Sequence, residues 1–280
     1  MITETLRRHP MLCYFQGFHD IAQVFLLVLG VENAPDAIAH LSLLRIRDFM
    51  LPSLAPSLAH LRLLPAILYS TDPELCQHLS QTQPFFALAA TLTLYAHDIQ
   101  EYGDIARLFD FLLAQEAVVS VYLFAVIILS RREELFEIPA DEPEMLHSVL
   151  SKLPKPLDLE ALIFKTMDLF SAHPPPSLPF RAWGKVSMYS VLKTTRGFTE
   201  KQTLQDGEEL FEMQALQLQR AELTQHAMTT LWKYRRPAGS VGLAVFIGII
   251  SFWLRRGGTD GVLGSGLRRV LELFRIIRMR

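Results

Sequence analysis

Residues 14–29 read YFQGFHDIAQVFLLVL, and this stretch decides the fold class. Aromatic residues flank Gln16 on both sides, and a helical pattern of apolar residues follows: Phe18, Ile21, Ala22, Phe25, Leu26, Val28 and Leu29. The pattern stops at Gly30, because glycine readily adopts the left-handed conformation that ends helices. We therefore predict a mostly buried helix that begins directly after an aromatic-flanked glutamine.

The following sequence repeats the helical pattern. Pro35, Pro73 and Pro84 stand where a first-turn proline is tolerated, and we expect a helix to start near each of them. Acidic first turns at 141–144 and 158–160 predict two further helices, because negative charge stabilises the N-terminus of a helix.

The run from Val118 to Leu129 is almost uniformly apolar. It is shorter than the ~18 to 20 residues that a membrane-spanning helix needs, so it favours a central helix buried on all sides. Strand signals are weak, since no stretch alternates polar and apolar residues between hairpin turns. We predict an all-α domain that ends near Phe170.

The composition changes after this domain. The prolines of 174–179 exclude a helix interior, because each removes a donor and clashes with the preceding turn. Glu, Gln, Leu, Ala and Met dominate 208–234, a composition typical of an exposed helix. We predict this order: a partial domain over 1–171, a proline-rich and polar linker over 172–207, an exposed stalk helix over 208–236, a transmembrane anchor over 237–254 and a basic amphipathic tail over 255–280.

The anchor prediction depends on an uncharged stretch. The eighteen residues of 237–254 carry no formal charge. At a rise of 1.5 Å per residue they span about 27 Å, which suits the thin bilayer of the endoplasmic reticulum. A hydrophobic core helix is the alternative for this stretch, and a solvated helix without a membrane role is the alternative for the tail.

Composition and motifs exclude several function classes. The net charge of -2 and pI near 6.5 do not fit a nucleic-acid binder. The two cysteines, Cys13 and Cys76, have no metal-ligand spacing, and no phosphate loop or hydrolase motif occurs. The adjacent pairs His19-Asp20 and His97-Asp98 are interpreted as structural, because neighbours on a helix point about 100° apart.

Three segments carry a family resemblance. Tyr14-Phe15-Gln16-Gly17 is similar to a Y-x-Q-G motif, and Arg107 to Leu112 resembles an R-x-x-D-x-x-L helix with Phe109 in place of tryptophan. Arg47-Asp48-Phe49-Met50 with Pro52 resembles a segment found in one membrane-anchored branch of the same family. Together they resemble the TBC-domain family of Rab GTPase-activating proteins, in its membrane-anchored early-secretory branch. The resemblance implies a multi-helix TBC-like fold, truncated at its N-terminus here.

The resemblance also implies a mechanism. Gln16 would act in trans on a Rab-family small GTPase in its GTP form, orienting the attacking water, and Tyr14 would position it. The Rab, not this chain, would hold GTP and magnesium, so we expect no cofactor or metal of the chain's own. The implied location is an endoplasmic reticulum or early secretory membrane, crossed once, with the domain facing the cytosol.

The family's arginine finger belongs to an I-x-x-D-x-x-R motif well upstream of the glutamine. Arg7 and Arg8 are the arginines before Gln16, and residues 2–8 do not reproduce that motif. An arginine finger contributes about 10³ to 10⁵ in rate, so we expect little activity from the chain alone. A finger-less Rab-binding adaptor and a helical membrane tether remain as alternatives.

Overall fold

The computed structural model describes residues 1–195 and 202–256, and the chain divides into two compact units after Leu218. These residues are helical with no strand among them, so the all-α prediction is confirmed. The longer helices are α1 (Ile2–Arg8), α2 (Phe18–Leu44), α3 (Ala55–Leu61), α4 (Leu64–Thr71), α5 (Pro73–His78), α7 (Tyr102–Ala114), α8 (Val119–Ser130), α10 (Pro143–Leu150), α11 (Leu159–Ala172) and α14 (Leu204–Arg256).

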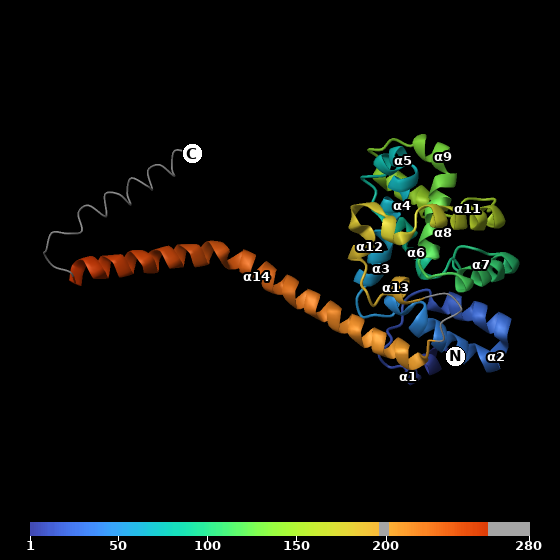
Figure 1. Cartoon of the computed structure of the whole chain (residues 1–280), viewed down its shortest axis with the longest axis horizontal. Helices are drawn as coiled ribbons and strands as arrows, with labels where there is room; N and C mark the ends of the chain where they lie inside the picture. Colours follow the sequence, from blue (N-terminus) through green and yellow to red (C-terminus); the bar gives the residue numbers. More distant parts are fainter. Residues whose placement is uncertain (196–201, 257–280) are drawn as a thin grey trace. The chain divides into compact units, whose positions relative to one another are not determined.

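Shorter helical turns connect them. These are η1 (Arg47–Phe49), η2 (Pro84–Ala87), α6 (Leu88–Leu92), α9 (Arg132–Phe136), η3 (Pro175–Ser177), η4 (Pro179–Arg181), α12 (Ala182–Lys185) and α13 (Val191–Thr194). In the first unit, α1 and α2 lie at one end and α5 and α9 at the other (Figure 1).

Helix α8 forms the centre of the first unit. Every residue from Val119 to Ile128 is buried, as the uniform apolar run predicts. Helices α4 and α11 pack against it. The Tyr122 hydroxyl donates to the backbone oxygen of His173 at 2.6 Å, which ties the end of α11 to α8.

Helix α2 is broken at the predicted glycine. Gly30 has φ 73° and ψ 176°, which no helix interior allows. The side-chain amide of Asn33 donates to the Leu29 oxygen at 3.3 Å across the break, and so satisfies one carbonyl at the end of the first half. The side chains of Leu27, Val28 and Val31 around the break are exposed.

Two predicted helix starts have the expected caps. The side chain of Asp72 accepts from the Leu75 N–H at 2.9 Å, and that of Asp158 accepts from the Ala161 N–H at 3.1 Å. Each carboxylate satisfies a backbone donor that the first turn of a helix leaves free.

The first compact unit of the structure runs to Leu218, beyond residue 171, where the partial domain is predicted to end. That predicted boundary stays a prediction. The described part of the predicted linker is packed rather than loose: Val191 and Leu192 are buried, and so are Ser190 and Thr195. Their partners lie about 140 residues earlier in the chain, as described below, and local composition gives no sign of such distant contacts.

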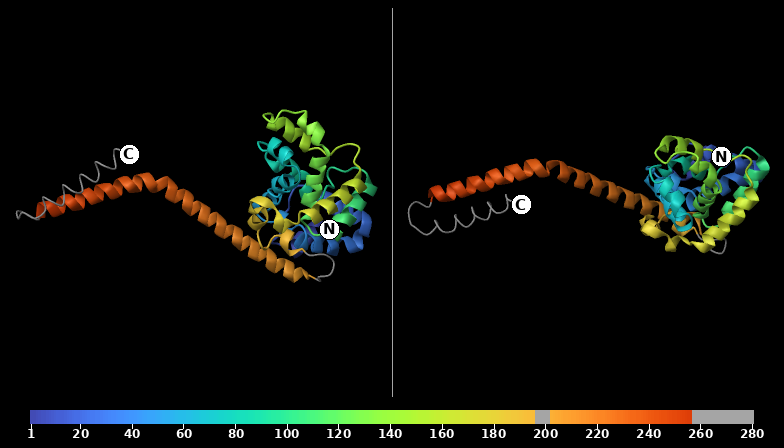
Figure 2. Two further views of the ribbon diagram at one scale, coloured as in Figure 1. Left: turned by 45° about the horizontal axis from the view of Figure 1, so that its top comes forward. Right: turned by 90° about the horizontal axis from the view of Figure 1, so that it is seen from above.

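The predicted stalk and anchor belong to one continuous helix, α14. Its first turns pack on the domain, where Phe211 and Gln214 are buried and His9 Nδ1 lies 2.7 Å from Glu208 Oε1. The left view of Figure 2 shows these turns beside the N-terminal helices. Farther along, the side chains described for residues 245–252 include exposed Val245, Phe246 and Ile249.

Among the described residues, α2 is the helix long and apolar enough to cross a membrane, with 27 residues and an 18-residue stretch of mean hydropathy 1.4. Its helical course is broken at Gly30, and Phe18, Ile21 and Ile38 are fully buried in the domain. Leu26, Val28 and Leu29 are exposed, so the prediction of a mostly buried helix is wrong for the residues just before the break. The anchor over 237–254 stays a prediction, and the amphipathic tail over 255–280 lies almost wholly outside the described residues.

Candidate functional site

Gln16 lies in a tight turn directly before α2. Next to it, Phe15 is buried, with its ring centroid 5.5 Å from that of Phe18 and 6.1 Å from that of Phe49. The N–H of Cys13 donates to the Met50 oxygen at 2.8 Å, which fixes the segment that leads into the turn. The aromatic residue before Gln16 therefore anchors the turn in the core.

Gly17 holds the other side of the turn. Its φ of 102° lies in the left-handed region that side chains disfavour, and it forms the N-cap of α2. A Cβ atom at this position would lie 2.5 Å from Cγ2 of Thr93, so the backbone approaches the neighbouring loop too closely for a side chain. The glycine is required both by conformation and by space.

Gln16 itself is exposed, and within the described residues its side-chain amide has no hydrogen-bonding partner. Tyr14, two residues earlier, is also exposed at 51% and packs edge-on against Phe18 with ring centroids 6.4 Å apart. The Tyr14 hydroxyl lies 3.1 Å from Nδ1 of His19. The two predicted site residues thus flank a buried phenylalanine and both face solvent.

The structure links the two His-Asp pairs to each other. His19 Nε2 lies 3.2 Å from Oδ1 of its neighbour Asp20 without forming a hydrogen bond, as expected for adjacent residues on a helix. The other oxygen of Asp20, Oδ2, lies 3.1 Å from Nδ1 of His97. The sequence analysis missed this contact, and the available signal was the repeated His-Asp dipeptide.

The carboxyl of Asp98 lies beside this group. Burial raises its pKa, and the negative charge of Asp20 raises it further, whereas His97 lowers it. Its Oδ2 atom is buried with no hydrogen-bonding partner among the described residues. The described residues contain no group of three His, Cys, Asp or Glu side chains that could hold a metal ion.

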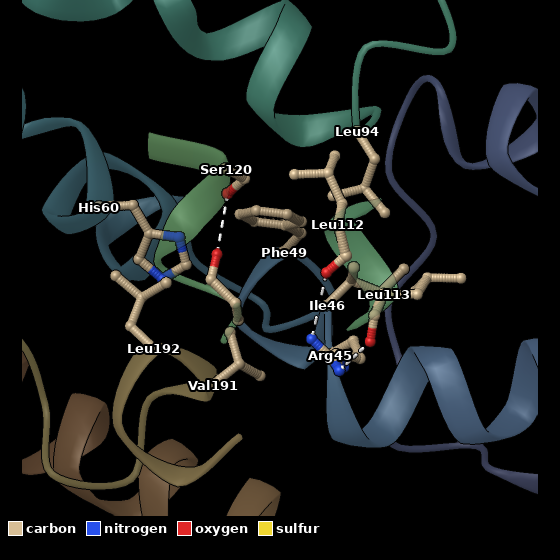
Figure 3. A pocket seen from close by; sticks show the side chains of 11 residues that line it. Arg45, Ile46, Phe49, His60, Leu94, Leu112, Leu113, Ser120, Val191 and Leu192 are labelled. Carbon is tan, nitrogen blue, oxygen red and sulfur yellow. Dashed lines mark hydrogen bonds between the residues drawn. The ribbon is translucent and has the colours of Figure 1, made fainter. Parts of the chain in front are cut away.

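Arg45 closes the far end of α2. Its guanidinium donates to the backbone oxygens of Leu112 and Leu113 (Figure 3). It also donates to the backbone oxygen of Gln115, and together these bonds cap the C-terminus of α7. Burial lowers the pKa of Arg45. The cavity beside it measures about 20 Å³, room for one water molecule and far below the ~300 to 1,000 Å³ of a small-molecule site. This cavity therefore does not hold a nucleotide.

Arg47 and Asp48 bind the segment that follows the predicted domain end. Arg47 donates to the Tyr189 oxygen and, at 2.5 Å, to Oγ1 of Thr194. Asp48 accepts from the Val191 N–H at 3.0 Å and from the Ser190 hydroxyl at 2.5 Å. Burial lowers the pKa of Arg47 to about 10, although Asp48 opposes the shift.

His60 completes this buried group, with Nε2 at 2.7 Å from Oδ2 of Asp48. Burial alone would raise the pKa of Asp48, but the contacts from His60, Ser190 and Val191 outweigh it and leave the pKa below its usual value. Ser, His and Asp also form hydrolase triads, yet here the serine donates to the carboxylate and all three side chains are buried. The group is a structural clamp.

The remaining residues of the resemblance lie in supporting positions. Arg7 and Arg8 both pair with Glu4 on α1, and Arg8 also pairs with Asp36 at 3.1 Å. Phe109, which stands in place of tryptophan, is buried and packs edge-on against Phe25 of α2 with centroids 6.1 Å apart. Both arginines are exposed and form ion pairs on the surface of the domain.

The structure is an all-helical domain with an exposed glutamine on a turn before a long helix, and comparison with known proteins identifies a domain family of this kind. Residues 5–136 match the Rab-GTPase-TBC domain model. These residues of the chain belong to the Rab-GTPase-TBC domain family.

Curated relatives support this assignment. GTPase-activating protein gyp10 of Schizosaccharomyces pombe is 36% identical over 223 residues, covering 78% of this chain and 60% of that protein. TBC1 domain family member 20 of Bos taurus is 36% identical over 175 residues, covering 62% and 43%. GTPase-activating protein GYP8 of Saccharomyces cerevisiae is 24% identical over 167 residues, covering 48% and 34%. The chain thus spans 60% or less of the length of each of these relatives.

Proposed function

We propose that this chain binds a Rab-family small GTPase in its GTP form and contributes Gln16 in trans to GTP hydrolysis. The observation that carries the proposal is the exposed Gln16 side chain, whose amide has no partner among the described residues while the residues on both sides are fixed. The family match and the names of the relatives as GTPase-activating proteins support it.

The amide chemistry suits the task. In GTP hydrolysis a water attacks in line while negative charge spreads over the transferred phosphoryl group. A glutamine amide can accept a hydrogen bond from that water and donate one to a phosphate oxygen, which neither a carboxylate nor a lysine can do. GTP and magnesium are held by the Rab, and Tyr14 positions the turn from which Gln16 reaches them.

The proposal includes a membrane site. The apolar stretch 237–254 would anchor the chain in an endoplasmic reticulum or early secretory membrane, with the domain on the cytosolic side, and the substrate would be a Rab of endoplasmic-reticulum-to-Golgi traffic. The exposed apolar side chains between Val245 and Phe252 support an apolar environment for this part of α14.

The test is single-turnover GTP hydrolysis by an early-secretory Rab. It is run with this chain and with a form that includes any coding sequence upstream of Met1, each as wild type and as Gln16→Ala. We expect Gln16→Ala to lower the accelerated rate about 10²-fold. Gln23→Ala, at an exposed glutamine on α2, the helix that follows the turn, is the matched control and leaves the rate unchanged. Acceleration that survives Gln16→Ala would rule out this mechanism.

A second candidate is a Rab-binding adaptor that does not accelerate hydrolysis. Residues 2–8, which carry Arg7 and Arg8, do not reproduce the family's arginine-finger motif, and this observation favours the adaptor. Binding of GTP-loaded Rab with hydrolysis at the intrinsic rate, in both forms of the chain, would support the adaptor. Failure to bind any GTP-loaded Rab would instead support a helical tether.

A further inference from the structure

Four polar side chains from two distant segments meet beside Gln16. Tyr14 contacts His19, His19 contacts Asp20, and Asp20 contacts His97, at 3.1, 3.2 and 3.1 Å. Gln16 lies within the same short stretch as the first three residues, and His97 comes from the loop that Gly17 touches through Thr93. The chain of contacts therefore joins the glutamine turn to the loop at 93–98.

Asp20 occupies the middle of this group. Its side chain is 18% exposed, whereas those of His19 and His97 are 53% and 64% exposed. Its Oδ2 atom hydrogen-bonds Nδ1 of His97, and its Oδ1 atom lies 3.2 Å from Nε2 of His19, so one carboxylate lies against both rings. The two histidine side chains face solvent, whereas the Asp20 side chain between them is largely shielded from it.

The loop that supplies His97 is itself fixed. Its residues Leu94 and Tyr95 have φ of 50° and 68°, and the Tyr95 hydroxyl donates to the buried Ser120 oxygen at 2.7 Å. The His97 N–H is directed to Oγ1 of Thr93 at 3.5 Å. The loop at 93–98 is therefore held in place by its own contacts, and Asp20 connects the glutamine turn to it through His97.

We propose that Asp20 is a positioning residue, which holds the Tyr14–Gln16 turn to the loop at 93–98 and so presents the Gln16 amide in one orientation. The proposal rests on the function proposed above for Gln16. Backbone packing fixes Phe15 and Gly17, but the exposed side chains around Gln16 need a tie of their own. Misplacing a catalytic group by about 1 Å can cost 10²-fold in rate, so such a tie has a measurable effect.

The experiment compares the full chain as wild type and as Asp20→Asn, which keeps the size of the side chain and removes its charge. Asp36→Asn, an exposed aspartate in the other half of α2, is the matched control. The first readout needs no partner: ring-nitrogen NMR of labelled histidine, and hydrogen exchange of the amides in 14–20. We expect Asp20→Asn to shift the signals of both His19 and His97 and to raise exchange at least several-fold, with Asp36→Asn unchanged.

The second readout is Rab GTP hydrolysis, with activator concentration varied to separate the maximal rate from the affinity. We expect Asp20→Asn to lower the maximal rate about 10-fold at unchanged affinity, and to add nothing in a Gln16→Ala background, because it acts through that residue. An additive loss, or unchanged histidine signals and exchange, overturns the proposal. If neither this chain nor the upstream-extended form accelerates any Rab, the Gln16 function fails, while the partner-free readout still decides whether Asp20 holds the turn.

Discussion

The backbone N–H of Val191 donates to Oδ1 of Asp48 at 3.0 Å, across a sequence separation of 143 residues. With the Ser190 hydroxyl and His60, it makes Asp48 the buried centre of a contact between η1 and the segment around α13. The strength of these hydrogen bonds depends on a charged carboxylate, because Asp48 accepts from each of its partners.

We expect Asp48→Ala to destabilise the first unit by about 3 kcal/mol, because it leaves several buried donors without an acceptor. The folded-state pKa of Asp48 is lowered, so the unfolded state binds the proton more readily. The stabilisation is therefore complete above the unfolded pKa of about 3.9 and is lost as the pH falls through the folded value. Urea unfolding between pH 3 and 7 measures both effects, with Asp141→Asn on the exposed surface as the control.

In contrast to Asp48→Ala, Asp98→Asn is expected to stabilise the first unit. Burial raises the folded-state pKa of Asp98, so the charged form opposes folding at neutral pH. The variant should gain less than about 1 kcal/mol at pH 7, after solvent screening is allowed for. The gain should disappear as the pH falls below about 3.9, where the carboxyl is protonated in both states. Thermal unfolding at several pH values tests this, and a gain that persists at low pH would contradict it.

Gly17→Ala should disrupt the glutamine turn. The positive φ and the 2.5 Å approach to Thr93 Cγ2 together predict a loss of about 1–3 kcal/mol and of Gln16-dependent hydrolysis. Gly103→Ala is the matched control, since nothing lies within 4 Å of its Cβ position in α7 and alanine favours a helix by up to ~1 kcal/mol. Equal stability of the two variants would show that the turn tolerates a side chain.

Ile249→Asp should weaken membrane association. An aspartate in the centre of a membrane helix costs about 2.5–3.5 kcal/mol, and the eighteen uncharged residues leave little margin to absorb it. Leu223→Asp is the control, because this exposed leucine lies on the same helix outside 237–254. Alkaline extraction of membranes from expressing cells measures the difference. Loss of association in both variants alike would argue against the assigned span.

The sequence predicted what depends on near neighbours. The caps at Asp72 and Asp158, the break at Gly30 and the buried run of α8 each follow from a few adjacent residues, and the structure confirms them. The turn at Gln16 also depends on adjacent residues, because Phe15, Gln16 and Gly17 follow one another in the sequence.

The features that the sequence did not predict depend on distant residues. The packing of 189–195 is decided by Arg47 and Asp48, and a local reading of a proline-rich stretch cannot include them. The bridge from Asp20 to His97 spans 77 residues and was missed for the same reason.

Gly207, in the first turn of α14, lies so close to α2 that a Cβ atom there would approach Cβ of Leu43 to 2.8 Å. The join between the two helices is flush, with no intervening side chain to yield. Any side chain at position 207 would therefore push the first turn of α14 away from the second half of α2, the half that follows the break at Gly30.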